Sequence, residues 1–128
     1  MASSPTETLD EYVRAFETLD PQHFASYYNL PCMFITPAGA TAATDAAAVQ
    51  ALAERLVTGA RQYGLKRTEL VGQLEWQMLS DTLAALGGVF RRFDSSDRVV
   101  VEMGSTYVVQ RVEDRWKIVV VMAYAPRA

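Results

Sequence analysis

The spacing of the hydrophobic residues changes near residue 66 of this 128-residue chain. In the helical stretches before Gly64 they recur at every third or fourth position, whereas in residues 67–78 they alternate with polar residues. A period of 3.6 residues is typical of an amphipathic helix, and a period of two is typical of a strand. The chain is therefore predicted to place helices before a set of long strands, which is the pattern of an α+β domain.

Helices are predicted at the positions where capping residues precede hydrophobic faces. Ser4, Asp20 and Asp45 (or Thr44) can each cap a helix, and Pro5 and Pro21 suit the first turn of the first two. The second helix is short and is expected to carry Phe24, Tyr27 and Tyr28. The third helix is the longest, and Gly64 is expected to end it.

Strands are predicted on either side of the longest helix. Short strands are expected at residues 32–36 and 40–43, and long ones at 67–78, 82–93, 98–112 and 116–124. Turn residues separate the long strands, so they should form an antiparallel sheet with the helices packed on one face. The whole chain, residues 1–128, is expected to form one domain.

The composition excludes several kinds of partner. A net charge of −3 provides no basic surface for nucleic acid or for an anionic membrane. The apolar run at 118–125 is too short to span a bilayer, and the first residues do not resemble a secretory signal.

Cys32 is the only cysteine and His23 the only histidine, so we expect a cytoplasmic protein without a metal site. No glycine-rich phosphate loop precedes a helix, and no cofactor is predicted.

The last strand is apolar on both of its faces. Strict alternation places Trp116, Ile118, Val120, Met122 and Tyr124 on one face and Val119, Val121 and Ala123 on the other. Residues 83–90 have the same two-sided character. Because monomers seldom expose large apolar patches, we expect a homodimer that buries the outer face of the C-terminal sheet. The alternative is a monomer with half-exposed valines.

The order of these elements resembles the NTF2-like superfamily, which includes SnoaL-like and ketosteroid-isomerase-like proteins. The resemblance lies in TLDEYVRAFETLDPQHFASYY, LPCMFITPAGAT, DAAAVQALAERL and the tail GSTYVVQRVEDRWKIVVVMAYAP. It implies a cone-shaped domain whose highly curved sheet wraps around the helices and leaves a cavity. It also implies that dimers can form through the outer sheet face. Some members are isomerases, dehydratases or hydrolases.

The inner face of such a cone is the expected ligand site. Its aromatic, methionine and hydroxyl side chains are typical of a pocket for a small apolar molecule. The candidates are Tyr12, Phe16, Tyr27, Tyr28, Phe34, Trp76, Met78, Met103, Tyr107, Trp116, Met122 and Tyr124. The alternative is that these side chains simply fill the core.

The sequence offers few candidate catalytic residues. Isomerase-like chemistry needs a carboxylate base near the first strands, and CMFITPAGATAAT contains none. Tyr12 could act as a phenol, and Arg91 and Glu102 could face each other across strands, either in water chemistry or as a structural ion pair. Two hypotheses remain: a pocket domain for a small hydrophobic molecule, or a non-catalytic dimerisation domain with a filled cavity.

Overall fold

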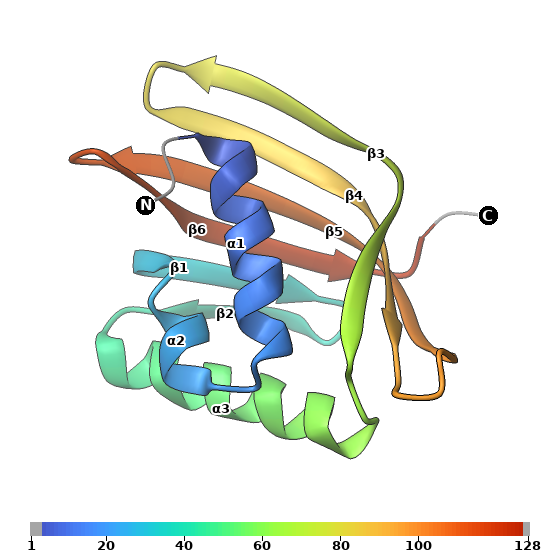
Figure 1. The fold of residues 1–128 in the computed structure, drawn as a ribbon. Coiled ribbons are helices and arrows are strands. Elements are labelled where there is room, and N and C mark those ends of the chain that lie inside the picture. Colours follow the sequence, from blue (N-terminus) through green and yellow to red (C-terminus); the bar gives the residue numbers. More distant parts are fainter. Residues whose placement is uncertain (1–3, 127–128) are drawn as a thin grey trace.

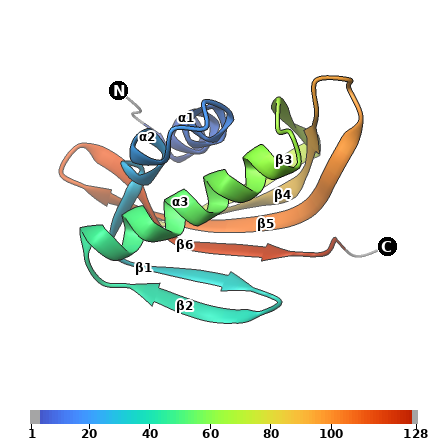
Figure 2. The same cartoon turned by 90° about the horizontal axis from the view of Figure 1, so that it is seen from below.

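A computed structural model of the chain describes residues 4–126. The domain predicted for residues 1–128 also includes residues 1–3 and 127–128, which lie outside the described part. The helices are α1 (Pro5–Glu17), α2 (Pro21–Ala25) and α3 (Ala46–Gln62). All three lie on one side of a curved, open sheet (Figure 1, Figure 2).

The sheet has six strands in the order β2-β1-β6-β5-β4-β3. They are β1 (Tyr28–Thr36), β2 (Gly39–Ala43), β3 (Arg67–Ser80), β4 (Leu83–Phe93), β5 (Val99–Val112) and β6 (Arg115–Tyr124). Neighbouring strands are antiparallel, except that β1 runs parallel to β6. The α+β class and the curved sheet predicted from the sequence are therefore confirmed.

Each helix begins at the capping residue that the sequence indicates. The Ser4 hydroxyl accepts a hydrogen bond from the Glu7 amide at 3.2 Å, and the Asp45 carboxylate accepts one from the Ala48 amide at 2.8 Å. Asp20 caps α2 in the same way. These side chains satisfy amides that have no partner within the helix.

The second helix is shorter than predicted. It ends at Ala25, so Tyr27 and Tyr28 are not helical, and Tyr28 is the first residue of β1. The reason is tertiary: Tyr28 is in register with Ile118 of β6, and the Ile118 amide donates to the Tyr27 carbonyl at 2.9 Å. Pairing with β6 supplies the backbone hydrogen bonds that a longer helix would otherwise have made.

A register shift between β5 and β6 changes which residues face the helices. Val109 pairs with Ile118, whereas Val108 pairs with Val120, so one extra residue lies in β6. Beyond the extra residue, each side chain of β6 points to the opposite face of the sheet from the one that strict alternation predicts. Trp116 and Ile118 therefore share the inner face with Val121 and Ala123, and the prediction that Val120, Met122 and Tyr124 share that face is wrong.

The core lies between the three helices and the inner face of the sheet. Helix α1 buries Leu9, Tyr12, Val13 and Phe16 against it. A polar contact also holds α1 against the sheet, because the Thr8 hydroxyl donates to the Trp116 carbonyl at 3.1 Å. Within residues 4–126, no helix is both long enough and apolar enough to cross a membrane.

Candidate functional site

A cavity of about 160 Å³ lies between the helices and the inner face of the sheet. The helices contribute apolar and aromatic side chains to its wall: Tyr12, Val13, Phe16, Phe24 and Leu56. Leu56 is 38% exposed and Thr36, another lining residue, is also exposed. The cavity therefore opens between α3 and the end of β1.

The strands that line the cavity differ in polarity from one side of the sheet to the other. From β1 and β6 come Phe34, Ile35, Thr36, Val121 and Ala123. From β5, β4 and β3 come Met103, Tyr107, Phe90, Arg92 and Thr68. Thr68 and Arg92 are directly paired across β3 and β4. One end of the wall is thus almost entirely apolar, and the other end holds a cation beside a hydroxyl.

Buried tyrosines form the polar part of the cavity floor. Tyr12 and Tyr107 line the cavity, and the Tyr12 hydroxyl is hydrogen-bonded to the hydroxyl of Tyr28. Burial is the main reason that the pKa values of Tyr12, Tyr28 and Tyr107 lie above the ordinary value of 10.0. These phenols are therefore uncharged near neutral pH and act as hydroxyl donors or acceptors.

Arg92 is the charged residue of the described lining. Its Nη1 donates to the Tyr63 hydroxyl at 2.8 Å, and its guanidinium lies 4.6 Å from the centre of the Phe16 ring. Its Nε is buried without a hydrogen-bond partner among the described residues. The ion pairs of residues 4–126 involve Arg14, Arg67, Arg91 and Arg98, and none of them involves Arg92.

The described wall holds no group suited to moving a proton at neutral pH. No Asp, Glu, His or Cys of residues 4–126 lines the cavity. Cys32 is buried outside it, and burial raises the pKa of its thiol. No cluster of three or more potential metal ligands occurs in that part of the chain. Among the described residues, the polar groups of the wall are phenols, threonine hydroxyls and one guanidinium.

The structure brings some of the predicted pocket residues together. Those that line the cavity are Tyr12, Phe16, Phe34, Met103 and Tyr107. Tyr28 does not line it and reaches the site only through its hydroxyl contact with Tyr12. These residues come from α1, β1 and β5.

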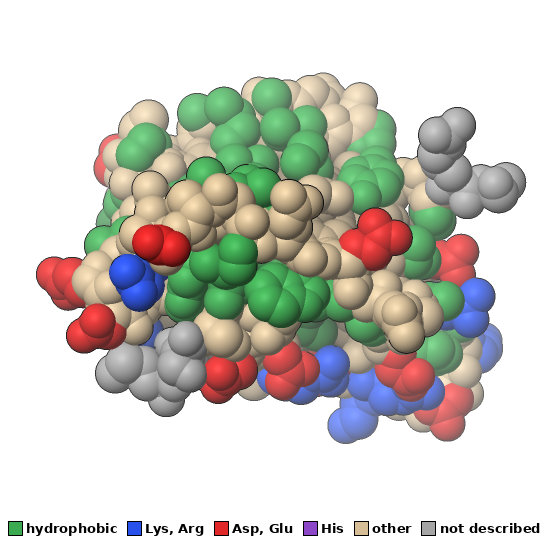
Figure 3. All heavy atoms as spheres, turned by 90° about the horizontal axis from the view of Figure 1, so that it is seen from above, with side chains coloured by type: hydrophobic (Ala, Val, Ile, Leu, Met, Phe, Trp, Pro, Cys, Tyr) green, Lys and Arg blue, Asp and Glu red, His purple; other side chains and the backbone are tan. Residues whose placement is uncertain are grey.

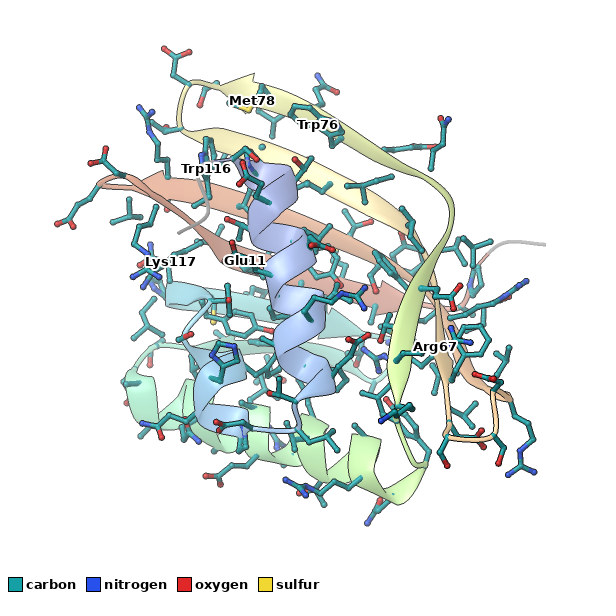
Figure 4. All side chains as sticks on the ribbon, viewed as in Figure 1. Glu11, Arg67, Trp76, Met78, Trp116 and Lys117 are labelled. Atoms are coloured by element: carbon teal, nitrogen blue, oxygen red, sulfur yellow. The ribbon has the colours of Figure 1, made fainter. Side chains whose placement is uncertain are left out.

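Trp76 and Met78 lie away from the cavity, on the part of β3 beyond the start of α1 (Figure 4). Their pairing with Leu86 and Ala84, which are buried, places them on the inner face. No helix of residues 4–126 covers that end of the sheet, and Trp76 is 51% exposed and Met78 is 42% exposed. Figure 3 shows hydrophobic side chains gathered on this upper side of the molecule.

The remaining predicted pocket residues also lie elsewhere. Met122 and Tyr124 are on the outer face, because the extra residue in β6 reverses the alternation. The Tyr124 hydroxyl there is 2.7 Å from the Thr106 hydroxyl. Tyr27 and Trp116 line a separate hollow of about 40 Å³.

The candidate catalytic pair forms an ion pair at a distance from the cavity. Arg91 and Glu102 are opposite each other on β4 and β5, and Arg91 Nε donates to Glu102 Oε2 at 2.5 Å. Both side chains are exposed on the outer face, and neither lines the cavity. Of the three catalytic candidates Tyr12, Arg91 and Glu102, only Tyr12 lines it.

Several lining residues were not predicted. Val121 and Ala123 were missed because their direction depends on the register shift. Arg92 was missed although a signal existed: in FRRF (90–93), Phe90 and Arg92 share one face of a strand. If Phe90 faces the core, so does Arg92.

Comparison with known proteins agrees with this architecture. The sequence profile of a family described as NTF2-like protein (DUF6841) matches residues 4–126. No curated protein sequence matches the chain.

Solved structures share the fold at low sequence identity. A Xanthomonas campestris protein, provisionally assigned as a calcium/calmodulin-dependent protein kinase II association domain, has a TM-score of 0.72 at 17% identity. The match covers 94% of this chain and 84% of that one. A Parabacteroides distasonis protein, provisionally assigned as a ketosteroid isomerase, has a TM-score of 0.70 at 17% identity. That match covers 96% of this chain and 88% of the other. A Nostoc punctiforme domain of unknown function with a cystatin-like fold has a TM-score of 0.70 at 18% identity. Here the match covers 94% of this chain and 74% of the other.

Proposed function

This chain belongs to the NTF2-like protein family DUF6841, and from that premise we propose that its cavity binds a small, largely apolar molecule about the size of one ring. The observation that carries the proposal is the cavity of about 160 Å³ between the helices and the sheet. Well-packed protein interiors leave few voids larger than a water molecule. A hollow of this size with aromatic walls is therefore suited to a ligand.

The volume limits the size of the ligand. Drug-sized molecules need a pocket of about 300 Å³ or more, whereas an engineered apolar cavity of roughly 150 Å³ in another protein holds benzene. The cavity of about 160 Å³ is close to the second value. A single ring or a branched chain of similar volume fits, and a fused polycyclic molecule does not.

The lining supports binding rather than acid–base catalysis. Similar structures include proteins provisionally assigned as a ketosteroid isomerase and a scytalone dehydratase. In this chain, the described wall provides phenols, threonines and an arginine but no carboxylate or imidazole. A reaction that needs a general base has no group there to accept the proton.

An NMR titration tests the proposal. Toluene is added to protein labelled at the methyl groups, and the signals of Met103 and Val121, which line the cavity, are followed. Saturable shifts at these methyls, with none at the exposed Met78, support binding in the cavity. No saturable shift up to the solubility limit of toluene would rule the proposal out.

A second function, dimerisation, is favoured by the outer face of the C-terminal sheet. That face carries Val108, Val120, Met122 and Tyr124, and Tyr124 is 42% exposed. We propose that two copies bury this face against each other, because apolar side chains are stabilised when they leave water. The mass in solution, measured by light scattering across a range of concentrations, tests this.

A further inference from the structure

Resting on the binding function above, we propose that the molecule held in the cavity carries a carboxylate, and that this carboxylate pairs with the guanidinium of Arg92. The ligand class is then a small carboxylic acid with one aromatic ring or a branched aliphatic chain. The inference begins from Arg92, a cation that lines the cavity and has no acidic partner among the described residues.

The contacts that Arg92 makes inside the protein use only some of the N–H donors of its guanidinium. A guanidinium has five N–H donors in a planar fork. Nη1 donates to the Tyr63 hydroxyl, and Nε is buried without an acceptor among residues 4–126. The Phe16 ring offers a favourable face to the cation, but it does not accept the in-plane N–H groups. A carboxylate is the acceptor whose geometry matches this fork.

Nearby acidic groups do not neutralise Arg92. Glu17, at the end of α1, accepts hydrogen bonds from the Thr68 amide at 2.6 Å and from Arg14 at 2.7 Å. Tyr12 and Tyr107 are kept neutral by burial, because their pKa values lie above the ordinary value. Among the described residues, Arg92 therefore forms no ion pair with an acidic side chain.

The polarity gradient across the sheet gives the ligand one orientation. Phe34, Val121 and Ala123 on β1 and β6 form the apolar end, which suits the ring or branched chain. Arg92 and Thr68 on β4 and β3 form the polar end, which suits the carboxylate. An uncharged molecule of the same shape would bury the same apolar surface and would leave Arg92 unpaired.

The experiment compares benzoate with benzamide, its uncharged analogue of similar shape. Both are titrated by NMR against the wild-type chain, Arg92→Gln, Arg92→Lys and Arg91→Gln. Arg91 is the matched control, because it neighbours Arg92 on β4 but forms an exposed ion pair on the opposite face.

The wild-type chain is expected to bind benzoate at least about tenfold more tightly than benzamide, as a charge-assisted pair would give. Arg92→Gln should remove that preference while keeping benzamide binding, which also shows that the variant is folded. Arg92→Lys should keep part of the preference, and Arg91→Gln should keep all of it.

Four results would overturn the inference. Equal binding of the two probes by the wild-type chain, or an unchanged benzoate preference in Arg92→Gln, would do so and leave the binding function standing. An equal loss in Arg91→Gln would mean that surface charge alone attracts benzoate. If benzoate, benzamide and toluene all fail to bind, the proposed function falls together with the inference.

Discussion

Filling the cavity by Ala123→Leu is the sharpest test of whether the space exists. Ala123 is partly buried on the inner face of β6 and lines the cavity. The substitution adds three carbons to a site with empty space beside it. We therefore expect the variant to be as stable as the wild-type chain or more stable, and to bind toluene much less tightly.

The expected change in the free energy of unfolding follows from the water-accessible area that the added carbons bury. Burying a methylene group stabilises a protein by about 0.8 kcal/mol, so three carbons give at most about 2.4 kcal/mol. Because Ala123 is only partly buried, some of the leucine stays in water. A gain of about 0–1.5 kcal/mol in the free energy of unfolding is the expected result.

A matched control is Ala84→Leu. Ala84 also lies on the inner face of the sheet, but it is 0% exposed and does not line the cavity. Extra carbons in a packed site force neighbours to move and typically cost about 1–3 kcal/mol. Urea unfolding should therefore show a loss of stability for Ala84→Leu and no loss for Ala123→Leu, with similar m values.

Ala123 lines the cavity and Ala84 does not. If Ala123→Leu loses as much stability as Ala84→Leu, the space beside Ala123 is already filled by protein atoms. If Ala123→Leu is stable but binds toluene as tightly as the wild-type chain, the ligand lies elsewhere. Either result would refute the assignment of the cavity as the binding site.

Further predictions concern the core, the tyrosines and the outer face. Trp116→Ala should lower the free energy of unfolding by about 3–5 kcal/mol, because the ring is only 7% exposed; an unchanged urea midpoint would show that this ring does not anchor the core. The contribution of the buried tyrosines to stability should be constant up to about pH 10 and fall above it. The reason is that burial raises the folded-state pKa values of Tyr12, Tyr28 and Tyr107, so that the unfolded chain releases its protons first; urea melts that stay unchanged to about pH 11.5 would contradict this. Val120→Glu should convert the proposed dimer to a monomer in light scattering without unfolding it, whereas a wild-type chain that is already monomeric at high concentration would refute the dimer.

Local chemistry in the sequence was enough to predict the elements. Ser4, Asp20 and Asp45 each carry an oxygen that accepts from backbone amides of the first turn, and such interactions involve only nearby residues. The change of hydrophobic period near residue 66 marks where the long strands begin, and β3 starts at Arg67. The α+β class followed from these local signals and was confirmed.

The direction of individual side chains was less predictable, because it depends on pairing between distant strands. Strict alternation placed Met122 and Tyr124 inside, but the shift between Val108 and Val109 turns them outward and brings Val121 and Ala123 to the cavity. Trp76 follows the alternation correctly and is still 51% exposed, because helix α1 does not extend over that end of β3.

The sequence by itself determined the helices, the long strands and their order, because caps, turns and hydrophobic periods act over a few residues. Only the tertiary structure decided that a cavity remains between α1, α3 and the sheet, and that Arg92 lies in its wall without an acidic partner among the described residues. The physical reason is that empty space and missing partners are properties of several elements packed together. Side chains from α1, α3 and the sheet leave that space jointly, and no short stretch of the chain encodes it.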